Sequence, residues 1–192
     1  MRKLVLVVPL VAVAAFLGYR HQQGQRLEHR LGAVASEVAR RPVKVHCQGE
    51  TGALLDVGPE LGTVQFDADG HPADRTDLKQ AACGWLAKLP LGSVAHAATA
   101  VEVLAHESYH LAGYRDEATA ECYALQTIPF VAERLGATPR QVRTWAAYSF
   151  ARYPSLPEEY VSSACVPGGT LDLRSPSSIW PSHAQTTSPS DQ

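Results

Sequence analysis

The sequence has little of what several large protein classes require. Its 17 Lys and Arg stand against 19 Asp and Glu. No basic stripe stands out, so nucleic acid is not an expected partner. None of its four cysteines forms a C-x-x-C pair, which argues against a cysteine-based metal site. Its 192 residues allow a single domain.

The two ends of the chain differ from its middle. Arg2 and Lys3 precede an uncharged run over residues 4–18, the pattern of an export signal. The run is short for a stable membrane span, so residues 1–19 are predicted to be a signal peptide or an N-terminal membrane anchor. Either alternative places the remaining chain outside the cytoplasm, secreted or membrane-anchored. Residues 176–192 are predicted to be a disordered tail.

The middle of the chain predicts an α+β domain that is mostly helical. Residues 20–42 carry apolar side chains at helical spacing and are predicted to form a stalk or a first helix. The domain itself is predicted over residues 43–175. Alternating segments at 43–47 and 62–66 predict a short two-stranded element.

Two further helices are predicted around the central motif described below. Residues 77–89 have inward-facing apolar positions, and Pro90 follows them. Thr138 and Gln141 form a capping box with Pro139 at the first helical position, and the helix they open is expected to end before Pro154.

The central motif is His106-Glu107-Ser108-Tyr109-His110, which reads H-E-x-x-H. Residues four apart lie on one face of a helix, so His106 and His110 can bind the same metal ion. Glu107 lies next to that face, where it can take a proton from a metal-bound water. The spacing therefore predicts a catalytic metal site.

A second helix is predicted to follow the motif. Gly113 is suited to the left-handed conformation that commonly ends a helix, and Asp116 is an expected N-cap for the next one, which Pro129 should end or kink. If the two helices are antiparallel, residues equidistant from the turn face one another. This pairs His110 with Glu117 and His106 with Glu121.

This arrangement resembles the zincin metallopeptidases, and among them the gluzincins, whose H-E-x-x-H helix is followed by a helix carrying E-x-x-x-D. The resemblance implies a Zn²⁺ ion bound by His106, His110 and Glu117, with Glu107 as the general base. Glu121 falls where the family usually has Asp, and would orient His106 through its other ring nitrogen. The resemblance covers about 25 residues. The whole chain is also similar to small exported bacterial proteins.

A second interpretation of the motif predicts a different third metal ligand. The stretch is also similar to the metzincin pattern H-E-x-x-H-x-x-G-x-x-D, which would make Asp116 the ligand. The only methionine is Met1, so the Met-turn of that group cannot form. Glu117 is therefore favoured, with Asp116 as the alternative. The short step from His110 to Glu117 requires a tight hairpin.

The cysteines support a location outside the cytoplasm. An even number in an exported chain implies two disulfides, for which three pairings exist. We favour Cys47 with Cys83 and Cys122 with Cys165. The second bridge would fasten the C-terminal segment to the helix that carries Glu117.

The function expected from these features is that of a zinc metalloprotease. It would hydrolyse peptide bonds of a peptide or protein substrate outside the cytoplasm, with Glu107 activating a zinc-bound water and with possible attachment to a membrane through the N-terminal segment. The alternative is a non-catalytic extracytoplasmic binding module, stabilised by disulfides or by zinc. His96, Tyr114 and Tyr123 are sequence candidates for stabilising an oxyanion.

Overall fold

The computed structural model describes residues 2–49, 60–173 and 180. The class is α+β and mostly helical, as predicted. In chain order the elements are α1 (Arg2–Ala39), β1 (Lys44–Cys47), β2 (Gly62–Phe66), β3 (Pro72–Leu78), α3 (Gln80–Leu86), α4 (Val94–Leu111), α5 (Glu117–Arg134), α6 (Pro139–Arg152) and the short 3-10 helices η1 (Tyr153–Ser155) and η2 (Glu158–Tyr160).

The strands form one small sheet in the order β1-β3-β2. β1 runs parallel to β3, and β2 runs antiparallel to it, with Gly62 opposite Leu78. The prediction of two strands missed β3, and residues 77–78, predicted to start a helix, belong to this strand. Most of the side chains of β3 are polar and only Thr76 and Leu78 are buried, so its sequence carries little strand signal. Among the described strands, β2 pairs with β3 alone and is an edge strand.

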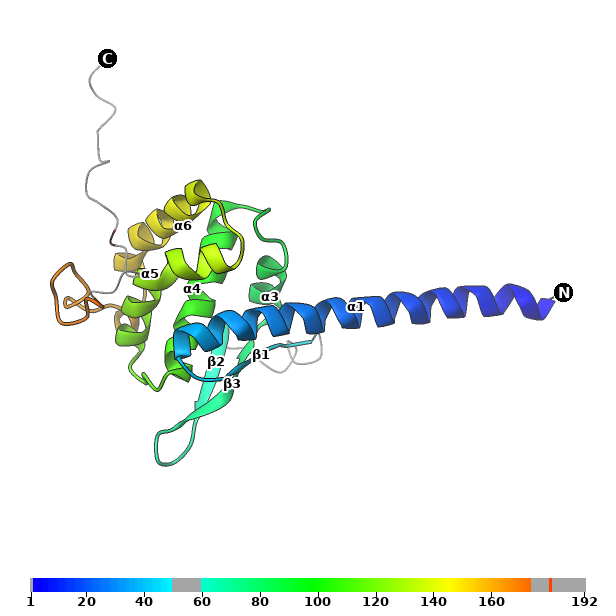
Figure 1. The fold of residues 1–192 in the computed structure, drawn as a ribbon, viewed down its shortest axis with the longest axis horizontal. Coiled ribbons are helices and arrows are strands. Elements are labelled where there is room, and N and C mark those ends of the chain that lie inside the picture. The colour runs from blue at the N-terminus through cyan, green and yellow to red at the C-terminus, as the bar shows by residue number, and fades with distance from the viewer. Residues whose placement is uncertain (1, 50–59, 174–179, 181–192) are drawn as a thin grey trace, which may run out of the picture.

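Helix α4 is the centre of the domain and contacts α1, α3, α5, α6 and the strands β2 and β3 (Figure 1). One face of α4 carries mostly apolar side chains at helical spacing, and all of them are buried: Ala97, Val101, Leu104, Ser108 and Leu111. The opposite face, with the two histidines, is also buried. The metal-site motif therefore lies inside the domain, where neighbouring elements restrict the side chains.

The N-terminal helix runs without a break from Arg2 to Ala39, across the two predicted segments 1–19 and 20–42. Its C-terminal part packs on β1 and α4 through Leu31, Val34 and Ala35, and its N-terminal part extends away from the other elements (Figure 1). A membrane anchor is one of the two predictions for residues 1–19. No helix within the described residues combines the length and the apolarity needed to cross a membrane.

One of the two outcomes predicted for Pro129, that it ends the helix, does not occur. Helix α5 does not end at Pro129 but continues to Arg134. α5 packs on α4 and α6, and this packing offsets the hydrogen bond that the proline nitrogen cannot donate. The Thr138 capping box that opens α6 is confirmed. The predicted tail at 176–192 lies, apart from Trp180, outside the described residues.

Both favoured disulfides are confirmed, and no cysteine is free. Cys47–Cys83 joins β1 to α3, and Cys122–Cys165 joins α5 to the C-terminal segment. Two disulfides in one small domain indicate an oxidising compartment outside the cytoplasm.

Candidate metal centre

A tight hairpin brings the two halves of the motif together. Gly113, with a φ of 102°, follows the end of α4 and allows the left-handed turn that a side chain would disfavour. Asp116 then caps α5 by accepting a hydrogen bond from the Thr119 backbone nitrogen at 2.8 Å. The turn is thus short enough for the first residue of α5, Glu117, to face the last turn of α4.

Three ligand atoms converge at this hairpin. Nε2 of His106 lies 3.0 Å from Oε2 of Glu117 and 2.8 Å from Nε2 of His110. The His110 Nε2 atom lies 3.3 Å from the same carboxylate oxygen. Ligand atoms of a tetrahedral zinc site are roughly 3.3 Å apart, given metal–ligand bonds of about 2.0–2.1 Å. The group of His106, His110 and Glu117 could therefore hold a metal ion.

The outer nitrogen of each imidazole has its own acceptor. His110 Nδ1 lies 2.7 Å from the Tyr114 carbonyl oxygen, and His106 Nδ1 lies 2.9 Å from Oε2 of Glu121. A carbonyl oxygen can only accept, so Nδ1 of His110 carries the hydrogen, and an ionised Glu121 imposes the same on His106. In the neutral form of each ring, the lone pair is then on Nε2, where a metal would bind.

The charges around His106 favour a cation at this point. Burial opposes protonation of the ring, but hydrogen bonds to Glu117 and Glu121, with the charges of Glu121 and Glu107, outweigh it and raise the pKa of His106 to about 10. In turn, hydrogen bonds to His106 and His110 lower the pKa of Glu117 to about 2. Without a metal, a proton on His106 supplies the positive charge between two facing nitrogens. A divalent cation can supply it in place of the proton.

Glu107 lies beside this group and beneath β2. Its side chain is 4% exposed, and its Oε2 lies 3.3 Å from the Thr76 hydroxyl. Burial raises the pKa of Glu107, while the charges of His106 and His110 oppose the rise. A carboxylate with a raised pKa is suited to take up a proton and return it.

Asp116, the alternative third ligand, does not join the two histidines. Its Oδ1 accepts hydrogen bonds from the backbone nitrogen and the hydroxyl of Thr119, which fits the predicted N-cap. The structure brings Glu117 to the histidines and Glu121 behind His106, as the predicted pairing across the hairpin requires.

The ligand group lies in a cavity of about 540 Å³. Its lining comes from β2, from the histidine face of α4, from the start of α5 and from residues between 152 and 160. An open cavity against the ligand group gives small molecules or a peptide access to it.

Sequence reasoning missed Tyr160 in the wall of this cavity. Its ring centroid lies 5.7 Å from that of His106. Burial, followed by the charges of Glu117 and Glu60, raises the pKa of Tyr160 to about 12, so its hydroxyl keeps its proton and can donate a hydrogen bond. Fifty residues separate Tyr160 from His110, and no spacing rule connects them.

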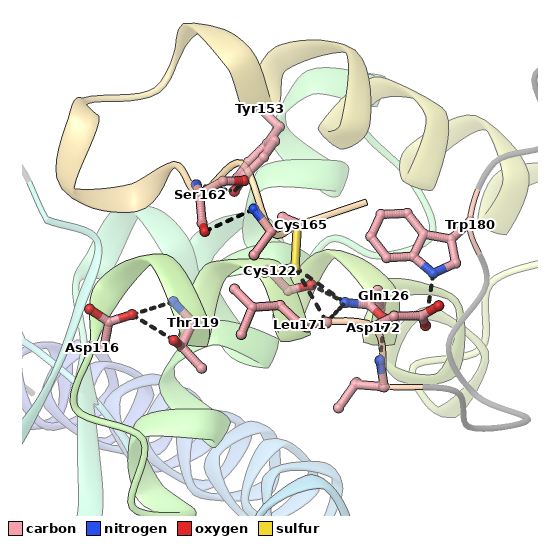
Figure 2. The surroundings of a disulfide bond; sticks show 12 residues. Asp116, Thr119, Cys122, Gln126, Tyr153, Ser162, Cys165, Leu171, Asp172 and Trp180 are labelled. Atoms are coloured by element: carbon pink, nitrogen blue, oxygen red, sulfur yellow. Dashed lines mark hydrogen bonds between the residues drawn. A yellow bond between two sulfur atoms is a disulfide. The ribbon is translucent and has the colours of Figure 1, made fainter. Parts of the chain in front are cut away.

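The disulfide Cys122–Cys165 fastens the C-terminal segment to α5 (Figure 2). It ties the chain that follows η2 to α5, on which η2 also packs. Around it, the Gln126 side chain donates to the Leu171 carbonyl at 2.8 Å and accepts from the Leu173 backbone nitrogen at 2.9 Å. These bonds fix the C-terminal segment against α5, the same helix that carries Glu117.

None of the three sequence candidates for oxyanion stabilisation lines this cavity. His96 stacks on Trp85 with centroids 4.5 Å apart. Tyr114 and Tyr123 pack together with Tyr109 in an aromatic cluster. Tyr114 contributes to the centre through its backbone carbonyl instead.

A second group of metal-competent side chains is exposed in the turn between β2 and β3. It consists of Asp67, Asp69 and His71. Asp67 accepts hydrogen bonds from the backbone nitrogens of the other two, which is the role of an aspartate in a turn.

Comparison with protein-family models, with curated proteins and with solved structures gives no match to this chain.

Proposed function

We propose that this protein is a zinc-dependent hydrolase that cleaves peptide bonds outside the cytoplasm, as a secreted or membrane-attached enzyme. One observation carries the proposal. Two imidazole Nε2 atoms and one carboxylate oxygen converge at the base of an open cavity, and both Nδ1 atoms are already engaged by acceptors.

The donor set supports zinc as the metal. Two histidines and one glutamate are a recurrent ligand set of catalytic zinc, which leaves a coordination position open. In this chain His106, His110 and Glu117 would hold the ion. When bound, zinc polarises a carbonyl group and lowers the pKa of water toward 7.

Two side chains of the cavity have the properties that hydrolysis needs. Glu107 is the base that takes the proton from the attacking water and passes it to the leaving amine. Its contact with β2 keeps the carboxylate in one place. The Tyr160 hydroxyl, which belongs to the same cavity, donates a hydrogen bond to the negative charge that develops on the substrate oxygen.

The edge strand supports a peptide as the substrate. β2 lines the cavity and pairs only with β3 among the described strands, so its other edge offers backbone groups to an extended chain. A peptide that adds to this edge would bind through its own backbone, largely independent of sequence. Its scissile carbonyl would then pass over the ligand group.

The test is the metal content of the purified, oxidised protein, measured by elemental analysis beside three variants. We expect one zinc per chain, lost in His110→Ala and in Glu117→Ala. Asp116→Ala is the matched control, because it removes the neighbouring carboxylate and should keep the zinc. Zinc lost with Asp116→Ala but kept with Glu117→Ala would contradict the ligand set proposed here.

A library of peptides then tests hydrolysis. Cleavage that requires zinc would support the enzyme. A protein that holds zinc and cleaves no member of the library would instead match the non-catalytic binding module.

A further inference from the structure

The junction of α4, α5 and α6 contains a cluster of buried polar atoms without hydrogen-bond partners. Among the described residues, four such side-chain atoms belong to this junction, namely Glu102 Oε2, Glu121 Oε1, Ser149 Oγ and Arg152 Nε. Buried polar groups are rarely left unpaired, and each one costs roughly 1–3 kcal/mol. Four at one place, next to the metal centre, call for a functional explanation.

An ion pair forms the outer part of this cluster. Arg152 of α6 donates through Nη2 to Oε1 of Glu102 on α4, and both residues line the metal-site cavity. Glu102 lies one helical turn before His106 and is only 4% exposed. The pair therefore connects α6 to the helix that carries both histidines.

Two carboxyl groups meet in the inner part of the cluster. Glu121 lies close enough to Glu102 to interact with it through both charge and a side-chain hydrogen bond. Burial, followed by the charge of Glu121, raises the pKa of Glu102 to about 8, although Arg152 and Ser149 oppose the rise. Two buried carboxylates cannot both stay ionised side by side without a donor between them. One shared proton satisfies both unpaired oxygens.

We propose that Glu102 and Arg152 are positioning residues of the metal centre, which act through Glu121 on His106. Arg152 holds Oε1 of Glu102, and Glu102, as the neutral acid, donates from Oε2 to Oε1 of Glu121. Oε2 of Glu121 then accepts from Nδ1 of His106. We call this chain of hydrogen bonds from Arg152 to His106 the relay. It fixes the imidazole ring of His106 so that its Nε2 faces the metal. This inference depends on the proposed metal site.

The test is the zinc affinity of the whole oxidised protein and of two Glu102 variants. Glu102→Leu removes the relay, and we expect zinc binding about tenfold weaker, at the lower end of the effects seen for partners of metal ligands. Glu102→Gln keeps it, because the amide nitrogen donates to Glu121 and the amide oxygen accepts from Arg152. Its affinity should stay within about threefold of the original.

A double-mutant cycle tests whether Glu102 acts through Glu121. In a Glu121→Gln background, Glu102→Leu should cost little further affinity, because the relay is already broken. Thr127→Val is the matched control for general loss of stability. Thr127 lies on α5, as Glu121 does, and the substitution removes a buried hydrogen bond of 2.7 Å to Tyr109 on α4. Zinc affinity should stay unchanged.

NMR spectroscopy can follow the imidazole ring of His106 directly. In the zinc-loaded protein the Nδ1 proton of His106 should be visible by NMR in the original and in Glu102→Gln. It should exchange faster with water in Glu102→Leu. If Glu102→Leu does not fold, Arg152→Met replaces it in both measurements, with an expected loss of roughly three- to tenfold in zinc affinity.

The outcomes separate this inference from the proposed function. Zinc bound equally well by the original and by Glu102→Leu would overturn the relay and leave the metal site intact. An equal loss in Glu102→Leu and Glu102→Gln, or full additivity with Glu121→Gln, would also overturn it. No zinc in the original protein would overturn both.

Discussion

Replacing Gly62 with alanine should move Glu107 without touching the metal ligands. A Cβ at Gly62 would lie 2.7 Å from Cγ and from Oε1 of Glu107, and 2.8 Å from Cδ. Ordinary contacts of a Cβ begin at 3.4 Å, so the carboxylate must retreat by about 0.7 Å, given the close packing around it. A displacement near 1 Å in a catalytic group can cost about 100-fold in rate, so we expect kcat to fall by roughly 10- to 100-fold.

The assay combines peptide hydrolysis with zinc analysis and thermal unfolding. Zinc content and stability should stay near their original values, since alanine is favoured over glycine in a strand by roughly 0.5–1 kcal/mol. Gly84→Ala is the control, because a Cβ at Gly84 meets no atom within 4 Å. Full kcat in zinc-loaded Gly62→Ala would refute the argument that β2 positions the base.

Three further predictions concern the general base Glu107, the proton on His106 and the Cys122–Cys165 disulfide. Glu107→Gln should keep one zinc per chain but lose at least 100-fold in kcat, the lower range for general-base catalysis; near-normal turnover would exclude Glu107 as the base. In the metal-free protein, protonated His106 stabilises the fold fully below pH about 6.5 and loses this contribution as the pH rises through about 10. The melting temperature of the metal-free protein should therefore fall as the pH rises over that range. The Kd for zinc should decrease by up to about tenfold per pH unit, because zinc displaces the proton of His106. If neither quantity changed with pH, a proton on His106 would not be the charge that zinc replaces. Replacing Cys122 and Cys165 with serine should cost about 4 kcal/mol in the free energy of unfolding, from the entropy of a loop that spans 43 residues, as measured by denaturant titration. A loss below about 1 kcal/mol would show that the crosslink constrains little.

The helices of this protein can be predicted from the sequence because the patterns that indicate them involve residues close together in the chain. The spacing of apolar residues in α4, the Asp116 cap and the Thr138 capping box each depend on side chains within a few positions of one another. β3 was missed because its stability comes from its neighbours β1 and β2, while most of its own side chains are polar and only two of them are buried. The continuation of α5 beyond Pro129 likewise depends on packing against other helices.

In the candidate site, too, local spacing predicts some of the residues and does not predict others. The H-E-x-x-H spacing and the short step to Glu117 predict the hairpin and its facing pairs, because helix geometry fixes which residues share a face. Tyr160 and Arg152 reach the cavity only through the path of the chain after α5. No local sequence pattern predicts the path of the chain after α5.

Short-range geometry and residue type are enough to predict the helical hairpin, the ligand candidates and the cysteines that are paired. The fold is needed to show that Glu117 rather than Asp116 faces the histidines, that β2 covers Glu107, and that Glu102 and Arg152 lie behind Glu121. The physical reason is that these relations are set by packing between elements distant in the chain, where burial and charge depend on all the neighbours at once.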